Sequence, residues 1–322
     1  MSALHHLSRR ELLSTEQLKS LNTINSSKVL FDITVCWLVI IGSWAVAAWG
    51  QQIWLYFICA AIVGNRFYAL FIIGHDGLHR RLHNNKDKND LISDIFVLAP
   101  IFAITRLNNR NHLNHHKYFG TSQDPDRYKY ESANKAEATS YVLYLTGIST
   151  LFRSAVNVFF KPAPGEMSDR ASANKAKGYT TRDVLVLIAV QTFLFATTTV
   201  FFGWWGYFLM WALPVYLFTF VPDFIRSFAE HSHPEHDSVA DEHRLITFEC
   251  NKIEQMIFAP MNMNYHAVHH LWPTIPYYNL LPATQLIKNN PLSDSLVWRH
   301  SYFHYLVSYL KKLPLKEYSN KQ

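Results

Sequence analysis

Charged residues are scarce in this sequence. They make up 17% of its 322 residues, which is below the ~25% of an ordinary soluble domain. The mean hydropathy of −0.04 would suit a soluble protein. This average hides a strong segregation, because long apolar runs alternate with segments rich in His, Lys, Arg and Asn. The distribution therefore favours a membrane protein with polar segments outside the bilayer.

Cysteine is almost absent as well. Cys36, Cys59 and Cys250 are too few and too scattered for a disulfide framework or a Cys-based zinc site. Acidic residues are outnumbered by basic ones, and the net charge is +6. No basic stripe with interleaved aromatic residues accompanies this charge. We therefore expect no nucleic-acid partner, and we attribute the positive charge to segments beside a membrane.

Four apolar runs are candidates to cross a bilayer, for which a helix needs ~20 residues. The first two cover about residues 30–49 and 53–74, and the other two about 184–202 and 207–221. A short turn separates the members of each pair. The sequence therefore predicts an all-α membrane protein with four transmembrane helices in two hairpins.

The positive charges predict an orientation. Lys and Arg number 4 before the first run, 16 within 75–182 and 9 from Arg226 onward, whereas the two turns carry none. The positive-inside rule then places both termini and the central segment in the cytoplasm. We expect a multi-pass integral membrane protein.

Two further apolar stretches are ambiguous. Residues 91–104 contain Pro100 and are too short to span, so we expect an interfacial or re-entrant segment. Residues 141–160 carry Arg153 and Asn157, which predicts an amphipathic helix lying along the membrane.

Histidine is abundant, with 17 residues, and its placement is informative. HDGLH at 75–79 follows the second run, HLNHH occupies 112–116, and HAVHH occupies 266–270. In a helix, residues i and i+4 share a face, so both imidazoles of such a pair can reach one metal. Adjacent histidines differ by about 100° around the helix and can serve different metals.

These motifs contain more histidines than one metal ion accepts. A tetrahedral zinc site takes four ligands, so two metals are implied. Imidazole suits iron, copper and zinc alike, and the ligand set does not name the metal. The motif HExxH is absent, which weakens the interpretation as a zinc protease.

The three motifs in this order, with Tyr265 before the third and Leu-Trp-Pro after it, resemble the membrane fatty acid desaturase and hydroxylase superfamily of three-histidine-box di-iron enzymes. The similarity covers about residues 30–282. It implies a catalytic domain over that range, with cytoplasmic segments at 1–29 and 283–322 and a cytoplasmic helical cap that holds a di-metal site. It also implies two Fe ions, with O2 as co-substrate. The metal ligands implied by the resemblance are His75, His79, His112, His115, His116, His266, His269 and His270.

Other residues are candidates around this set. Members of the superfamily use a further histidine after the fourth span, which nominates His231 as the ninth ligand. Some relatives have an asparagine one turn earlier, where this chain has Ser227. Asp76, Asp124 and Asp126 are candidate acceptors for imidazole N–H groups, although a plain turn is the alternative at 124–126.

The resemblance implies an O2-dependent desaturase that introduces a cis double bond into the acyl chain of a lipid, in a narrow apolar slot. A hydroxylase or ketolase acting on a lipid, carotenoid or hydrocarbon would carry the same motifs. A non-enzymatic metal transporter is the alternative from another class, and it would place ionisable groups along the spans. The expected partners are the acyl substrate, the bilayer and a separate electron donor, either a ferredoxin or a small cytochrome, because no haem or iron–sulfur segment is fused to the chain.

Overall fold

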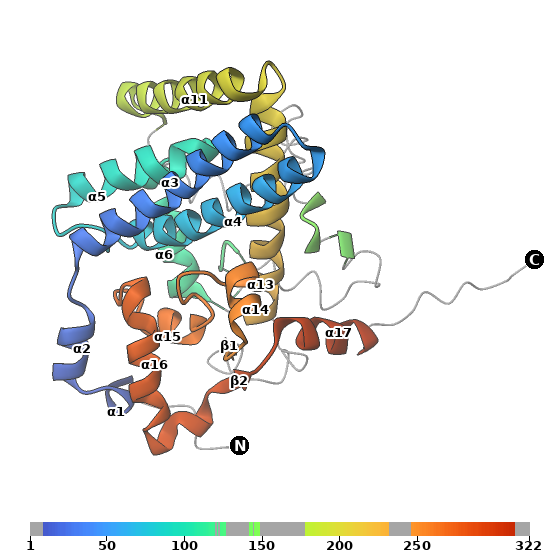
Figure 1. Cartoon of the computed structure of the whole chain (residues 1–322). Helices are drawn as coiled ribbons and strands as arrows, with labels where there is room; N and C mark the ends of the chain where they lie inside the picture. The colour runs from blue at the N-terminus through green and yellow to red at the C-terminus, as the bar shows by residue number, and fades with distance from the viewer. Residues whose placement is uncertain are drawn as a thin grey trace, which may run out of the picture.

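The computed structural model describes residues 9–119, 121, 123–126, 142–143, 145–148, 178–231 and 246–312. These residues are mostly helical (Figure 1), which confirms the helical class. The strands β1 (Ile246–Phe248) and β2 (Val297–Arg299) form a short parallel pair. The helices and helical turns are α1 (Arg9–Leu12), α2 (Thr15–Leu21), α3 (Ser26–Gly50), α4 (Ile53–Leu78), α5 (Lys86–Ser93), η2 (Asp94–Leu98), η3 (Ala99–Ile101), α6 (Thr105–Tyr118), α11 (Thr181–Phe202), η4 (Phe208–Ala212), α12 (Leu213–Val215), η5 (Tyr216–Phe220), α13 (Val221–His231), α14 (Lys252–Phe258), α15 (His266–Leu271), η7 (Tyr277–Asn279), α16 (Leu280–Lys288), η8 (Pro291–Ser295) and α17 (Tyr302–Lys312).

Four helices in the described part are long and apolar enough to cross a membrane: Ser26–Gly50, Ile53–Leu78, Thr181–Phe202 and Phe208–His231. The first three contain the predicted runs 30–49, 53–74 and 184–202, and the fourth covers the run 207–221 from residue 208 onward. The fourth continues beyond residue 221 to His231. The apolar pattern did not predict this extension, because the last turns of the helix contain polar residues that are buried by other segments.

Apolar side chains cover the outside of these helices. On α11, Leu185, Phe193 and Val200 are 61%, 64% and 85% exposed. Figure 1 shows α11 at the edge of the molecule, beyond α3 and α4. Such a contiguous apolar surface is unusual for a soluble protein and suits contact with lipid.

The short apolar stretch at 91–104 does not form a span. It contains the end of α5, the π-helical turn η2 and the 3-10 turn η3, and it ends near Phe102, which has a left-handed backbone with φ of 59°. η2 packs on α4, and η3 packs on α11. The amphipathic helix predicted at 141–160 lies outside the described residues, apart from 142–143 and 145–148.

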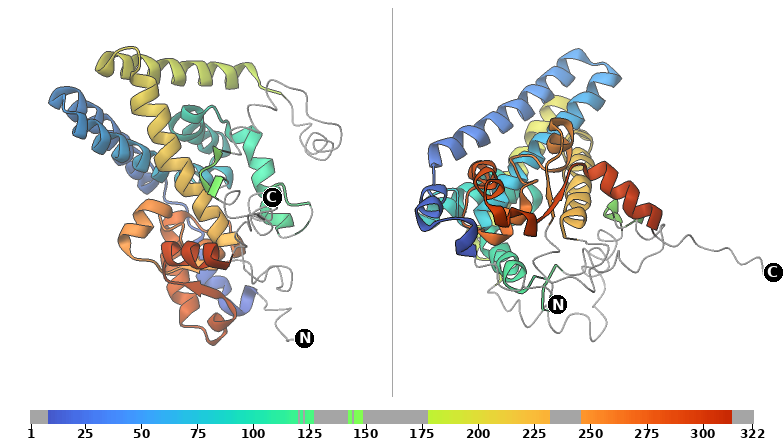
Figure 2. Two further views of the ribbon diagram at one scale, coloured as in Figure 1. Left: turned by 90° about the vertical axis from the view of Figure 1, so that its right-hand side faces the viewer. Right: turned by 90° about the horizontal axis from the view of Figure 1, so that it is seen from below.

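The C-terminal elements form a layer at one end of the long helices, together with α1 and α2 (Figure 2). Tyr277 ties this layer to two of those helices. Its hydroxyl donates to Asp32 Oδ2 of α3 over 2.5 Å, and its backbone N–H donates to Asp76 Oδ2 of α4 over 2.6 Å. The layer therefore has a defined position against the helix ends.

Gly64 allows α4 to approach the fourth long helix closely. A Cβ added at Gly64 would lie 2.2 Å from the backbone oxygen of Pro214 and 2.7 Å from Phe218 Cβ. We expect Gly64→Ala to destabilise the protein by about 1–3 kcal/mol, because the backbone must move apart. Gly42→Ala is the matched control, since nothing lies within 4 Å of its added Cβ. Thermal unfolding in detergent measures both, and equal melting temperatures would contradict this packing.

Candidate metal centre

Nine histidines converge where the C-terminal layer meets the long helices. They come from the end of α4, from α6, from the last residue of α13 and from α15. They form two groups. The first histidine group is His75, His79, His112, His116 and His269, and the second histidine group is His115, His231, His266 and His270.

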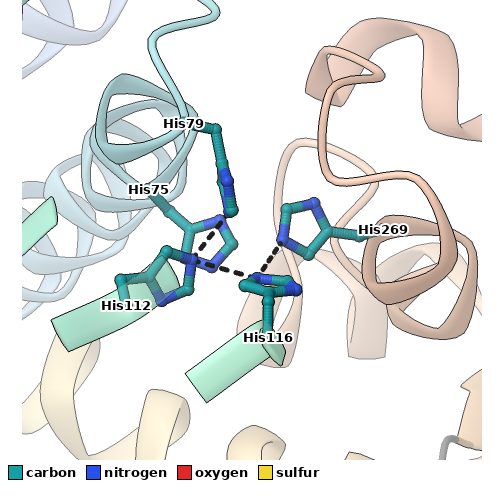
Figure 3. Close-up of side chains that lie close together, drawn as sticks. All are labelled: His75, His79, His112, His116 and His269. Atoms are coloured by element: carbon teal, nitrogen blue, oxygen red, sulfur yellow. Dashed lines mark hydrogen bonds between the residues drawn. The ribbon is translucent and has the colours of Figure 1, made fainter. Parts of the chain in front are cut away.

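The first histidine group draws its members from three helices (Figure 3). One nitrogen of each ring lies within 4.8 Å of the corresponding nitrogen of every other ring. The Nε2 atoms of His112 and His79 are 2.8 Å apart, and those of His116 and His269 are 3.2 Å apart. The rings point toward one common centre.

The second histidine group is more deeply buried. The candidate nitrogens of His115, His231 and His270 lie within 4.8 Å of one another. His266 joins them, because its Nε2 is 3.0 Å from the Nε2 of His231. All four side chains are buried, with exposed fractions of 6% or less.

Each HxxHH motif divides its histidines between the groups. On α6, His115 turns to the second group while its neighbour His116 turns to the first. On α15, His269 turns to the first group while His270 turns to the second. This division follows from the ~100° rotation between adjacent helical residues.

Hydrogen bonds to neighbouring elements hold α6 in position. The backbone N–H of Thr105 donates to Asp94 Oδ1 over 2.7 Å and so supplies an acceptor in the first turn. Asp94 Oδ2 is 2.9 Å from Arg182 Nη1 of α11. Further along α6, the Asn109 amide donates to the Leu78 carbonyl at the end of α4. The second motif is thereby fixed against the first.

The start of α15 is anchored to β1. The Asn264 amide donates to the Phe248 carbonyl over 2.7 Å, and the Phe248 N–H donates to the Asn264 carbonyl over 3.0 Å. β1 in turn pairs with β2, so the third motif is held by the C-terminal part of the chain.

The predicted acceptors for imidazole N–H groups take different positions. Asp124 Oδ1 lies 2.8 Å from His115 Nδ1, and it also accepts the backbone N–H of Asp126 over 2.8 Å, as in a turn. Ser227 meets His231 through its backbone carbonyl, 2.6 Å from Nδ1, and not through its hydroxyl. Asp76 accepts from the backbone of Tyr277, and its Oδ1 makes no hydrogen bond within the described part of the chain.

Sequence reasoning missed a buried polar network next to the second histidine group. Glu230 Oε2 lies 3.4 Å from His266 Nδ1 and 2.6 Å from Arg226 Nη1. Its Oε1 accepts from the Tyr302 hydroxyl over 2.6 Å. The one available signal was the i, i+4 spacing of Arg226 and Glu230 just before His231.

Burial keeps several of the imidazoles neutral. It lowers the pKa of His79 to about 3, and the positive charge of Arg81 acts in the same direction. The pKa values of His112, His269 and His270 also lie well below the usual range of histidine, with burial as the largest cause. At neutral pH these four rings therefore each offer one lone pair and one N–H.

This arrangement fits a metal better than a hydrogen-bond network. His112 Nε2 faces both His79 Nε2, at 2.8 Å, and His116 Nε2, at 3.2 Å. Because each ring nitrogen carries either one N–H or one lone pair, His112 Nε2 can make a well-directed hydrogen bond with only one of these two neighbours, whereas a cation can accept the lone pairs of all three. Imidazole is a good ligand for iron, copper and zinc. The two groups are thus compatible with bound metal.

A cavity of about 380 Å³ opens onto both groups. Phe71, Leu78, Leu98 and Ile101 form its apolar side, so α4 and the η2–η3 segment supply that wall. Its polar side contains histidines of both groups together with Asp126, Asp223, Arg226 and Ser227. An apolar molecule in this cavity would lie against the candidate metal sites.

The known proteins to which this chain is similar include several desaturases. The chain is similar to an sn-1 acyl-lipid omega-3 desaturase (ferredoxin) from Nostoc sp. (strain 36), with 28% identity over 276 residues that cover 82% of this chain and 76% of the relative. It is also similar to an sn-1 oleoyl-lipid 12-desaturase from Arthrospira platensis, with 23% identity over 83% of this chain and 80% of the relative. A dihydrorhizobitoxine desaturase from Bradyrhizobium elkanii is 25% identical over 74% of this chain and 69% of the relative.

These relatives support an oxidoreductase. The family model described as fatty acid desaturase matches residues 52–302, which include all three histidine motifs and His231. The chain therefore belongs to the fatty acid desaturase family.

Proposed function

We propose that the nine histidines hold two iron ions and that the protein uses O2 to introduce a cis double bond into the acyl chain of a membrane lipid. The convergence of both histidine groups on a cavity with an apolar wall carries this proposal. The relatives named as acyl-lipid desaturases support the choice of substrate.

The protein's own contribution is to bind and to orient. The neutral imidazoles offer their lone pairs to the metals, and the side chains of Phe71, Leu98 and Ile101 hold a methylene segment by apolar contact. Bound iron would supply, together with O2, the oxidising chemistry needed to break unactivated C–H bonds, which side-chain acid–base chemistry cannot provide. The apolar wall also limits the entry of water.

The reaction needs an external reductant. Two hydrogens leave adjacent carbons, and O2 takes them up with two electrons and two protons to give two water molecules. We propose that a ferredoxin or a small cytochrome delivers the electrons, and the name of the Nostoc relative, which includes ferredoxin, supports the first of these. A basic cytoplasmic surface would favour an acidic donor.

The membrane arrangement completes the proposal. The four long helices form two hairpins, with both termini and the metal centre on the cytoplasmic side. The support is the absence of Lys and Arg from the turns at 50–52 and 203–206. Within this arrangement the catalytic domain covers 30–282, between cytoplasmic segments 1–29 and 283–322.

Expression in a host with well-defined lipids tests the function. Fatty acid profiling by mass spectrometry should show a new product two hydrogens lighter than a host fatty acid, and oxygen consumption should depend on added reductant. A product that gains one oxygen would identify a hydroxylase on the same scaffold. A protein that binds metal but consumes no oxygen with any donor would contradict both enzymes and favour a metal transporter.

A further inference from the structure

The two histidine groups differ behind their metal-facing nitrogens. In the first group, the buried Nδ1 atoms of His75, His116 and His269 make no hydrogen bond within the described residues. In the second group, oxygen atoms lie behind three of the four rings. His115 faces Asp124 at 2.8 Å, His231 faces the Ser227 carbonyl at 2.6 Å, and His266 faces Glu230 at 3.4 Å.

Glu230 is held firmly in its position. Its side chain is fully buried, with an exposed fraction of 0%. Arg226 Nη1 donates to Oε2 and the Tyr302 hydroxyl donates to Oε1, each over 2.6 Å. Tyr302 is itself fully buried, and its ring stacks on Phe248 with centroids 3.9 Å apart. Both carboxylate oxygens are thus fixed by side chains that cannot easily move.

Arg226 does not occupy the Glu230 carboxylate alone, so Glu230 can also contact His266. Arg226 also pairs with Asp223 Oδ1, at 2.8 Å from Nη2, so one guanidinium lies between two carboxylates. Arg226 Nη1 is 3.5 Å from His266 Nδ1 and could only donate to it, which would put the His266 proton on Nε2 and leave no lone pair there for a metal. If His266 binds a metal through Nε2, its Nδ1 carries the proton, and the carboxylate of Glu230, 3.4 Å away, is the acceptor within reach.

A proton shared between His266 Nδ1 and Glu230 gives His266 the tautomer that a metal ligand needs. With the proton on Nδ1 next to Glu230, the lone pair is on Nε2. That Nε2 lies 3.0 Å from the Nε2 of His231, inside the second histidine group. A carboxylate behind a metal-binding imidazole fixes the ring and raises its basicity as a ligand.

We propose that Glu230 is a positioning residue for the second metal: it orients His266, and Tyr302 of α17 holds Glu230 in place. This inference rests on the proposed metal centre. It makes the two metal sites unequal, because the first histidine group has no such carboxylate in the described part of the chain. It also gives the C-terminal helix α17 a role in the metal centre, although Tyr302 lies in the segment 283–322, which the sequence placed outside the catalytic domain.

Metal retention in Glu230→Gln tests the proposal. Loss of such a partner weakens metal binding by about 10–100-fold, so the variant should lose about half of its iron to a chelator that leaves the wild type intact. Mössbauer spectra of iron-enriched protein should show one of the two iron signals altered and the other retained. Tyr302→Phe, which removes only the hydroxyl, should shift the same signal by a smaller amount.

Glu249→Gln is the matched control. Glu249 is also a glutamate paired with a cation, with Oε1 2.8 Å from Lys288 Nζ, but its described contacts include no imidazole. We expect this variant to retain both irons and both signals.

The outcomes separate the two proposals. If the wild type contains no iron, the proposed function fails first. If the wild type contains two irons and both Glu230→Gln and Tyr302→Phe retain them with unchanged spectra, the positioning role is wrong and the metal centre stands. Equal loss of both irons in a folded Glu230→Gln protein would also overturn the selective role. Should Glu230→Gln fail to fold, Tyr302→Phe decides the question by its spectrum.

Discussion

Replacing His269 with alanine is expected to abolish the desaturated product. His269 is fully buried, and its Nε2 lies 3.2 Å from His116 Nε2 at the centre of the first histidine group. Loss of an outer partner of a metal ligand already costs about 10–100-fold in activity, so loss of the ligand itself should exceed that range. Fatty acid profiling measures the product, and metal analysis of the purified variant measures the lost iron.

His112→Ala should behave in the same way, because His112 Nε2 faces two other members of that group, His79 and His116. His83→Ala is the matched control, since His83 belongs to neither group and its Nδ1 accepts the backbone N–H of Asn85. We expect product and iron content to stay at wild-type level in this control. Retained product in either ligand variant would refute that residue as a ligand.

Local patterns explain how much could be predicted from the sequence. The four long helices follow from apolar runs, and each motif follows from spacing within one helix. The division of His115 from His116, and of His269 from His270, follows from the same helical rotation. His231 could be nominated only by resemblance, yet it lies next to both His266 and His270.

The surroundings of the histidines could not be predicted in this way. Glu230 and Tyr302, which form a hydrogen bond, are 72 residues apart in the sequence, and Tyr277 and Asp32 are 245 residues apart. No periodicity encodes such contacts, because they depend on how the C-terminal layer lies against the helix ends. Ser227 illustrates the same limit, since its backbone carbonyl makes the contact and any residue there would supply one.

At the end of the fourth long helix, the local sequence pattern and the long-range contacts lead to different expectations. Its last turns, 222–231, contain Asp223, Arg226 and Glu230, which would favour a polar surface segment outside the span. All of α13 from Arg226 to His231 is nevertheless buried. Burial of this many charges is tolerable only because they pair with one another and with Tyr68 and Tyr302.

Arg226→Met should therefore destabilise the protein strongly. The side chain of Arg226 is 5% exposed. Its removal leaves the carboxylates of Glu230 and Asp223 without the cation that pairs with both. Breaking a buried pair by removing one member costs about 3–5 kcal/mol. Thermal unfolding in detergent should show a large drop in melting temperature.

Lys28→Met is the matched control, because Lys28 and Asp32 form an i, i+4 pair like Arg226 and Glu230 but the lysine side chain is 45% exposed. Exposed pairs contribute below about 1 kcal/mol, so its melting temperature should change little. The melting temperature of Arg226→Lys should fall between those of the wild type and Arg226→Met, since an ammonium keeps the charge but cannot reproduce the forked contacts to both carboxylates.

In the double variant Arg226→Met with Glu230→Gln, the loss of stability should be smaller than the sum of the two single losses, because the neutral amide no longer leaves a buried charge unpaired. Additive losses would mean that Arg226 stabilises the helix by packing alone, and that the carboxylate behind His266 does not depend on it.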